Sequence, residues 1–188
     1  MLDFATSADI VAPQLLGATL SHAGVTLRIT EVEAYLGTTD PASHSHNGMT
    51  RRNLPMFGPP AHFYVYRSYG IHLAGNIVCA EEGIGHAVLL RAGEIIDGLP
   101  LALQRRGKLP FHKLAQGPGN LGKALDFTLE LNRASIFGPE LQFTPRATAP
   151  EITSGPRIGI SKNTDAPLRF WIPNHPTVSR RKTPHRAQ

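Results

Sequence analysis

Residues 62–79 read HFYVYRSYGIHLAGNIVC, and this stretch predicts the centre of the fold. Its two halves, 62–69 and 70–79, are rich in aromatic and β-branched residues, and they meet at Gly70. That pattern is typical of two strands that reverse direction in a hairpin. Upstream, residues 26–35 (TLRITEVEAY) alternate apolar and polar side chains as a half-buried strand does. Downstream, residues 85–96 (GHAVLLRAGEII) predict another strand.

Shorter elements are expected on either side of these strands. Residues 8–19 predict a helix, and a second helix is expected after GPGN, with Asn120 as its N-cap, running through LGKALDF. Residues 37–60 predict a loop with turn signals, too long to be a passive connection. The remaining expected strands cover 141–144, 156–161 and 168–172. The pattern as a whole predicts a strand-dominated α/β domain with helices at its periphery.

The composition indicates one globular domain over residues 1–188, since glycine and proline are spread along the chain without a boundary. Hydrophobic residues make up 41%, too many for disorder, yet no run approaches the roughly 20 apolar residues that span a bilayer. The start of the chain lacks the basic residues of a signal peptide. A single cysteine, Cys79, excludes an internal disulfide. We therefore expect a cytoplasmic protein with no membrane partner.

The net charge of +5, from 19 Lys and Arg against 14 Asp and Glu, favours a polyanionic partner such as nucleic acid. If the basic residues share a face, they can follow a phosphate backbone, and binding should depend steeply on salt. Solvated surface charge with a basic tail from about residue 179 is the alternative. In AQGPGNLGKAL, the glycine-rich helix start makes Gly119 and Lys123 candidate DNA contacts, although no helix is predicted before it. The basic residues form three clusters: Arg51 and Arg52; Arg105, Arg106, Lys108 and Lys113; and Arg180, Arg181, Lys182 and Arg186.

Carboxylates and tyrosines supply the candidate chemistry. Glu31 and Glu33 lie two apart in a predicted strand, so both side chains point to one face, as a candidate base or as solvent-facing groups. All four tyrosines fall within residues 35–69, where they can stack nucleic-acid bases or simply pack across a hairpin. The His44 and His46 pair has no third ligand at metal-site spacing, and no phosphate-binding glycine motif is present. Neither a metal nor a cofactor is expected.

Five ordered blocks of the sequence resemble the alkyladenine (3-methyladenine) DNA glycosylase family, over about residues 10–178. The resemblance implies one compact domain with a curved antiparallel sheet and peripheral helices. It further implies a monofunctional base-excision-repair enzyme that flips a damaged purine out of duplex DNA and hydrolyses its N-glycosidic bond, leaving an abasic site. A bacterial protein is expected, because the long N-terminal extension of eukaryotic members is missing, and a basic single-domain glycosylase is expected to act as a monomer. The blocks are EVEAYLGTTDPASHS (31–45), NLPMFGPPAHFYVYRSYGIHLAGNIV (53–78), AVLLRAGEI (87–95), GPGNLGKAL (117–125) and PRIGISK (156–162).

The resemblance also implies the catalytic residues. Glu33 corresponds to the general base that activates water against the sugar carbon C1′, with Glu31 in support. Arg91 corresponds to the arginine that binds the phosphate of the flipped nucleotide and helps to place the water. The backbone carbonyl of Ile158 corresponds to a second group that holds this water. Because no lysine lies in the blocks near Glu33, a Schiff-base lyase step is not expected.

The base-binding and DNA-binding residues follow from the same resemblance. The flipped base would lie between Tyr35 on one side and Tyr66 and His44 on the other. Backbone groups of Ala42 and His44 would bind the base edge, and Asn76 would exclude the 2-amino group of guanine. Tyr69 corresponds to the residue that inserts into the duplex and fills the space left by the flipped nucleotide.

Two other function classes remain open at this point. A non-catalytic nucleic-acid-binding module would show the same basic clusters and tyrosines, but it gains nothing from Glu33 facing a phosphodiester. An N-glycosidase acting on RNA or nucleosides would share Glu33, but it has no use for a wedge such as Tyr69. The expected partner is therefore double-stranded DNA with damaged purines. Purines alkylated at N3 or N7 should leave most easily because they are cationic, and hypoxanthine is also expected.

Overall fold

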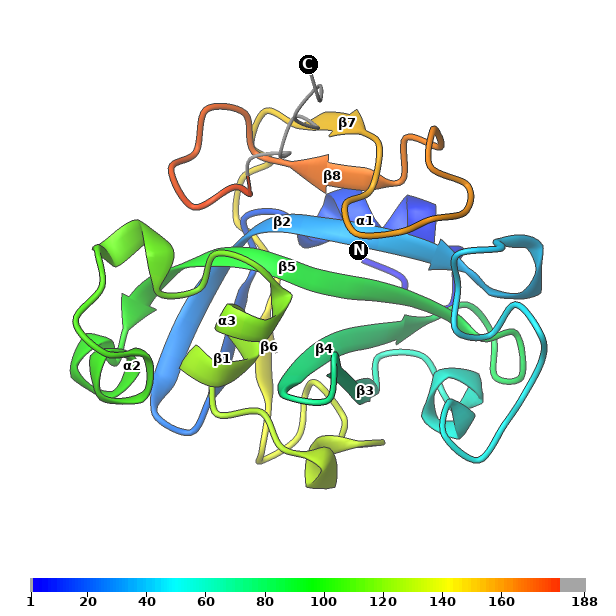
Figure 1. Cartoon of the computed structure of the whole chain (residues 1–188), viewed down its shortest axis with the longest axis horizontal. Helices are drawn as coiled ribbons and strands as arrows, with labels where there is room; N and C mark the ends of the chain where they lie inside the picture. Colours follow the sequence, from blue (N-terminus) through cyan, green and yellow to red (C-terminus); the bar gives the residue numbers. More distant parts are fainter. Residues whose placement is uncertain (1, 180–188) are drawn as a thin grey trace, which may run out of the picture.

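The computed structural model describes residues 2–179, which form a curled antiparallel sheet with three short helices around it (Figure 1). The predicted fold class, mixed α/β with a curved antiparallel sheet and peripheral helices, is confirmed. The helices and strands are α1 (Ala8–Leu15), β1 (Thr19–His22), β2 (Val25–Leu36), β3 (Phe63–Ser68), β4 (His72–Cys79), β5 (His86–Asp97), α2 (Leu99–Arg106), α3 (Pro118–Ala124), β6 (Gln142–Thr144), β7 (Thr153–Gly155) and β8 (Arg169–Trp171).

The sheet follows the order β3-β4-β5-β2-β1-β6, and every strand pair in it is antiparallel. The two long strands β2 and β5 cross the middle of the molecule, with β7 and β8 above them and the β3–β4 hairpin below (Figure 1). Register shifts interrupt the β2–β5 pairing between Ile29 and Val32. Such irregularities increase local twist and re-aim side chains, and these flank Glu31.

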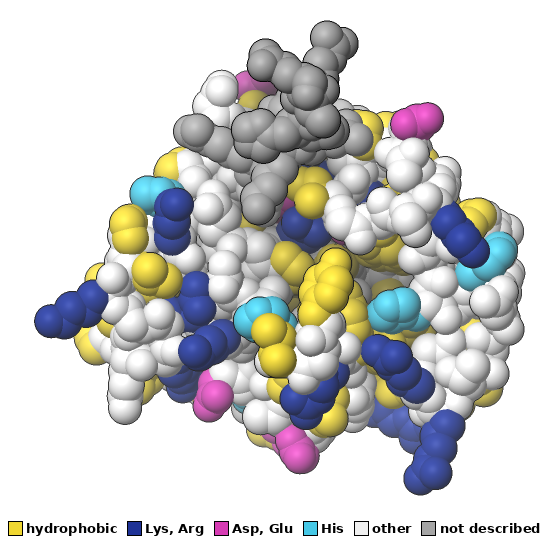
Figure 2. Space-filling view, in the orientation of Figure 1, with side chains coloured by type: hydrophobic (Ala, Val, Ile, Leu, Met, Phe, Trp, Pro, Cys, Tyr) yellow, Lys and Arg dark blue, Asp and Glu magenta, His cyan; other side chains and the backbone are white. Residues whose placement is uncertain are grey.

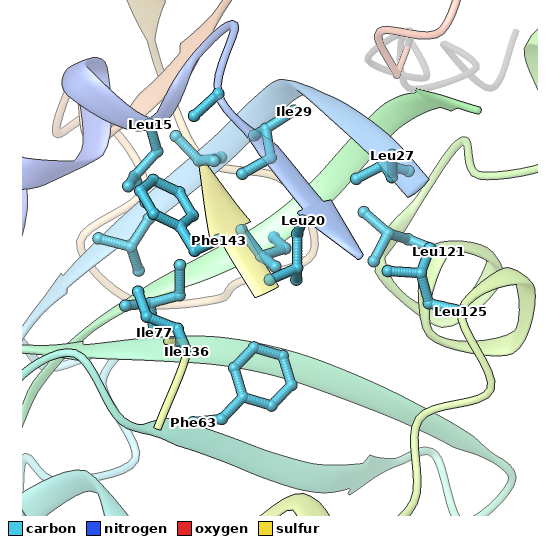
Figure 3. Close-up of a cluster of buried hydrophobic side chains, with 14 of the residues drawn as sticks. Leu15, Leu20, Leu27, Ile29, Phe63, Ile77, Leu121, Leu125, Ile136 and Phe143 are labelled. Atoms are coloured by element: carbon cyan, nitrogen blue, oxygen red, sulfur yellow. The ribbon is translucent and has the colours of Figure 1, made fainter. Parts of the chain in front are cut away.

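The core lies between the sheet and α1. Leu15 of α1, Leu20 of β1 and Phe143 of β6 point into one buried space together with Ile77 and Ile136 (Figure 3). Apolar burial of this kind supplies the main favourable free energy of folding. Cys79 is also buried there, and its burial raises the pKa of its thiol. Among residues 2–179, no helix has the length and apolar character needed to cross a membrane.

The hairpin expected at Gly70 is confirmed. Tyr69 and Gly70 both have positive φ, 48° and 72°, and the N–H of Ile71 donates to the carbonyl of Ser68 at 3.2 Å. Two successive left-handed residues define the type I′ turn, whose twist matches that of the flanking strands. The turn leaves the Tyr69 side chain 87% exposed at the tip.

Several boundaries in the second half of the chain differ from prediction. The strand expected over 156–161 is wrong, because β7 ends at Gly155, before Pro156. Asn120 is not the N-cap of α3: Gly117 occupies that position, and the Asn120 amide donates to the Gln116 carbonyl from the first turn. This helix ends at Ala124, three residues before the end of the expected LGKALDF run, and α1 ends at Leu15 rather than near residue 19.

The expectation that no helix precedes the GPGN segment is also wrong. Helix α2 lies before it, with Pro100 in its first turn. Backbone N–H groups of the first turn have no partner within the helix, so proline, which lacks an N–H, loses no hydrogen bond there. The Arg105 guanidinium donates to the carbonyls of Ala124 and Ala23, and Arg106 donates to Leu114. Arg105 therefore ties α2 to α3 and to the β1–β2 turn, and Arg106 ties α2 to the segment before α3, in addition to carrying charge.

Candidate active site

A pocket of about 660 Å³ opens beside the β3–β4 hairpin. It gathers side chains from β2, β3, β4 and β5, from the loop after β2, and from the segment after β7. Figure 2 shows this face hollowed near its centre, beside a protruding hydrophobic side chain, with Lys and Arg side chains at several places around it. The predicted site residues that line the pocket are Tyr35, Ala42, His44, Tyr66, Tyr69, Asn76, Arg91 and Ile158.

Glu33 lies behind the wall of this pocket, bonded to residues that line it, and is fully buried. Its Oε1 accepts the backbone N–H of Ile158 at 2.7 Å and lies 3.3 Å from Nη1 of Arg91. Its Oε2 accepts the hydroxyl of Tyr35 at 2.9 Å. The reading of Glu33 as a solvent-facing strand carboxylate is therefore wrong, because all its partners belong to pocket-lining residues.

Glu31 points to the same side of the sheet as Glu33, as predicted, and it is also fully buried. Its Oε1 accepts Nε of Arg91 at 3.1 Å and Nε of Arg169 at 2.7 Å, while Oε2 accepts the backbone N–H of Ser179. Arg91 thus bridges the two glutamates. Burial lowers the pKa of Arg91, but the charges of Glu33 and Glu31 outweigh that effect and raise it. Arg91 stays a cation in the pocket wall.

Tyr35 forms one side of the pocket and is held from behind. The guanidinium carbon of Arg157 lies 4.6 Å from the centre of the Tyr35 ring, in cation–π geometry. Arg157 is in turn locked to Asp40 by two hydrogen bonds, of 2.5 and 2.8 Å, one from each terminal nitrogen. Burial favours a higher pKa for Asp40, but hydrogen bonds from Arg157 and Asn163, together with the charge of Arg157, lower it to about 2.

His44, Tyr64 and Tyr66 form the facing side. The Tyr64 and Tyr66 rings are stacked with centroids 5.8 Å apart, and the His44 ring meets Tyr66 edge-on at 4.5 Å. His44 Nδ1 lies 3.2 Å from the Tyr64 hydroxyl. Burial, and then the charge of Arg52, lower the pKa of His44, so the ring is neutral at pH 7. Tyr64 and Tyr66 therefore stack on each other along β3, and both line the pocket.

The loop that carries His44 is fixed by a buried amide. The Asn53 side chain donates to the carbonyls of His44 and Gly48 and accepts the N–H of Thr50. The N–H of Ala42 is already bonded to Asp40. Of the backbone groups expected to read a base edge, the Ala42 N–H and the His44 carbonyl are thus engaged within the protein.

Asn76 lies at the inner end of the pocket, opposite Tyr64 in the hairpin register. It is 4% exposed, and its amide nitrogen donates to the Tyr64 carbonyl at 3.0 Å. This bond fixes the orientation of the side chain, so a group that reaches the end of the pocket meets a polar amide with little freedom to move.

The rim of the pocket carries cations and the exposed Tyr69. Arg52, Arg67 and Lys162 all line it, and each of the three residues is exposed. Gly119 and Lys123 do not line the pocket: Gly119 packs α3 closely against His72, where an added Cβ would lie 2.8 Å away, and Lys123 is exposed in the last turn. Of the three basic clusters, the one from Arg180 to Arg186 lies outside the described residues.

The pocket can do one kind of chemistry well. A carboxylate paired with a guanidinium, between aromatic walls, can accept a proton from water and stabilise a nearby positive centre while the walls hold a flat ring. No group of three or more His, Cys, Asp or Glu side chains that could hold a metal occurs within residues 2–179.

Some of these residues were missed at the sequence level. Arg157 lies inside the PRIGISK block, but its partner Asp40 reads as an ordinary Asp-Pro turn, 117 positions earlier. Arg169 and the backbone of Ser179 complete the surroundings of Glu31 from the end of the described chain. No local pattern indicates these contacts, because each depends on segments that only the fold brings together.

Comparisons with known proteins identify the family of this chain. The family model for methylpurine-DNA glycosylase (MPG) matches residues 2–176. A Corynebacterium glutamicum protein named as a 3-methyladenine DNA glycosylase is 62% identical over 182 residues, covering 96% of both chains. Proteins of the same name from Corynebacterium efficiens (60% over 181 residues; 96% and 95% covered) and Nitrosospira multiformis (49% over 179 residues; 95% and 92% covered) are also similar. The chain therefore belongs to the methylpurine-DNA glycosylase family of N-glycosyl hydrolases.

Proposed function

We propose that this protein removes damaged purines from double-stranded DNA, flipping each one into the pocket and hydrolysing its N-glycosidic bond with a water that Glu33 activates. The observation that carries the proposal is the placement of Glu33, which is fully buried directly behind a tyrosine-lined pocket and pairs at 3.3 Å with Arg91, a residue of the pocket wall. Moving a carboxylate out of water costs solvation free energy. The hydrogen-bond and ion-pair partners of Glu33 offset this cost.

The proposed reaction places the sugar carbon C1′ beside Glu33. As the bond to the purine lengthens, the sugar gains oxocarbenium character, which the negative carboxylate stabilises. Water adds to C1′ and gives its proton to Glu33. Arg91 and the carbonyl of Ile158, whose groups lie 3.4 Å apart, border the space where this water would be held. The products are a free purine and an abasic site.

The proposed base site lies between Tyr35 and the pair Tyr66 and His44. Stacking on aromatic faces accepts any purine, and each stacked base contributes about 1–3 kcal/mol. Discrimination then falls to Asn76, whose fixed amide would meet the 2-amino group of guanine. A steric or unpaired-polar penalty of this kind rejects a wrong base without improving the binding of the right one.

The exposed Tyr69 supports duplex DNA as the substrate rather than RNA or a nucleoside. A tyrosine that is 87% exposed at a hairpin tip buries its ring only when another molecule covers it. Stacked base pairs offer such a slot, and a side chain inserted there compensates for the flipped nucleotide. Arg52, Arg67 and Lys162 around the pocket supply positive charge for phosphates. We further propose that one chain acts alone, since it supplies the pocket and the wedge.

The lesions are expected to rank by how readily the purine leaves. Alkylation at N3 or N7 makes the base cationic, so it departs without protonation, whereas hypoxanthine needs a proton or a tighter fit. The described partners of Glu33 are Tyr35, Arg91 and Ile158, while Lys162 is exposed at the pocket rim, which supports simple hydrolysis rather than a Schiff-base route.

The test is product analysis with duplexes that carry 7-methylguanine, hypoxanthine or only unmodified guanine. We expect free 7-methylguanine and hypoxanthine to be released, strands that break only after alkali, no borohydride-trapped adduct, and no release of guanine. Equal release from single-stranded RNA or free nucleosides would favour the RNA or nucleoside glycosidase instead. Tight binding of lesion duplexes without release of any base would identify a binding module.

A further inference from the structure

The Tyr35 hydroxyl makes a contact that base stacking does not require. It donates to Oε2 of Glu33 at 2.9 Å, although a phenyl ring would stack a purine equally well. We propose that Tyr35 is also a positioning residue, whose hydroxyl orients the Glu33 carboxylate so that one lone pair of Oε2 faces the attacking water. This inference rests on the proposed function and adds a second role to a residue of the same site.

The argument starts from the acceptor capacity of the carboxylate. Each oxygen has two lone pairs. The Oε1 atom accepts the Ile158 N–H at 2.7 Å and lies 3.3 Å from Arg91 Nη1, so two donors face it. The Oε2 atom receives one donor from the described residues, the Tyr35 hydroxyl. The second lone pair of Oε2 is thus the place where a proton from water can go.

The Tyr35 ring is itself held in place, so its hydroxyl is a reliable donor. Arg157 lies 4.6 Å behind the ring and is anchored by Asp40 and by the carbonyl of Ala34. Burial, followed by the charge of Glu33, raises the pKa of Tyr35 well above its usual value, which keeps the hydroxyl protonated. The bond therefore persists over the pH range in which the enzyme would work.

The hydroxyl donates to a carboxylate, so its removal takes away a charge-assisted hydrogen bond that holds the orientation of Oε2. Charged and titratable side chains surround Glu33 on each element that packs against it. They are Glu31 and Tyr35 on β2, Tyr66 on β3, Arg91 on β5 and Arg157 after β7, while Arg169 on β8 contacts Glu31.

The experiment is single-turnover excision of 7-methylguanine from a duplex by wild type and Tyr35→Phe, over a range of enzyme concentrations. This lesion is already cationic, so its rate does not depend on protonation of the leaving group. We expect the maximal rate to fall about tenfold. The half-saturating enzyme concentration should stay within about twofold, because the stacking ring is retained.

Two further variants make the test specific. Tyr66→Phe removes another hydroxyl of the pocket, one that faces the charge of Glu33 but makes no hydrogen bond to it within the described residues, and it should lower the maximal rate less than Tyr35→Phe does. Replacing Tyr35 by 3-fluorotyrosine keeps both the ring and the donating hydroxyl, so the maximal rate should return to near that of wild type. The positioning role is overturned if Tyr35→Phe weakens saturation at an unchanged maximal rate, or changes neither. If wild type releases no base, the proposed function itself fails.

Discussion

At the residue scale, the site is a set of buried charges that neutralise one another. Three carboxylates and three guanidiniums are buried around the pocket: Glu31, Glu33, Asp40, Arg91, Arg157 and Arg169. Each carboxylate has at least one guanidinium within 3.3 Å. Because a buried charge without a partner is strongly destabilising, loss of any one of these side chains should affect the fold as well as the reaction.

The ion pair between Asp40 and Arg157 makes the free energy of unfolding depend on pH. Its pKa is lowered to about 2 in the folded protein, against a usual value of 3.8. A lowered pKa stabilises the fold fully above about pH 4, and the contribution of about 2 kcal/mol is lost as the pH falls from 4 toward 2. Asp40→Asn should lower the free energy of unfolding at pH 7, with a much smaller effect at pH 2.

Denaturant unfolding of wild type and Asp40→Asn at several pH values measures this difference. Asp165→Asn is the matched control, because Asp165 is exposed, and its unfolding curve should follow that of wild type. If the free-energy gap between Asp40→Asn and wild type were the same at pH 2 and pH 7, the carboxylate of Asp40 would not be the stabilising group.

At the element scale, the β3–β4 hairpin combines regular pairing with a strained tip. Tyr69 adopts φ +48°, a left-handed conformation that disfavours bulky residues and suits asparagine or glycine in a type I′ turn. The β1–β2 turn has the same form at Ala23 and Gly24, with φ of 46° and 77°, far along the chain from the pocket residues. Strained backbone conformations cluster at functional sites, and Tyr69 is an exposed aromatic residue in such a conformation.

Tyr69→Asn should therefore separate stability from activity. Asn-Gly is the preferred sequence for this turn, so the free energy of unfolding should rise by about 0.5 to 1 kcal/mol. Excision from duplex DNA should fall at least tenfold, because an inserted wedge contributes a few kcal/mol to holding the flipped state.

Ala23→Asn tests the same turn chemistry away from the pocket, and it should stabilise the fold without changing excision. Melting curves and single-turnover rates of both variants measure the two effects. A Tyr69→Asn protein with wild-type duplex activity would show that Tyr69 is not a wedge.

The long strands and the short strands β6 and β8 were predicted from the sequence, whereas β1, α2 and β7 were not. Strands β2, β3, β4 and β5 contain long runs of apolar, aromatic and β-branched residues, which predict strands although consecutive residues in them are buried. The expected strand at 156–161 instead turns inward, because Arg157 and the Ile158 backbone bind groups on β2 and the loop that follows it. Tertiary contacts decided this local conformation.

At the scale of the whole molecule, the pocket is assembled from segments far apart in sequence. The resemblance-based residues on β2, β4 and β5 meet there because those strands are neighbours in the sheet. The network behind them was not predictable: Ser179 reaches Glu31 across 148 positions, and Arg157 reaches Asp40 across 117. Composition indicated a polyanionic partner, and the exposed Arg52, Arg67 and Lys162 at the pocket rim are consistent with it.

The most direct test of the account is single-turnover excision of 7-methylguanine from duplex DNA by Glu33→Gln beside wild type, with lesion binding measured on the same proteins. Glutamine keeps the size of the side chain but cannot accept the proton of the attacking water. We predict that excision falls at least a hundredfold, within the range expected for loss of a general base, while binding of the lesion duplex is retained. Excision by Glu33→Gln at the wild-type rate would contradict the assignment of Glu33 as the base.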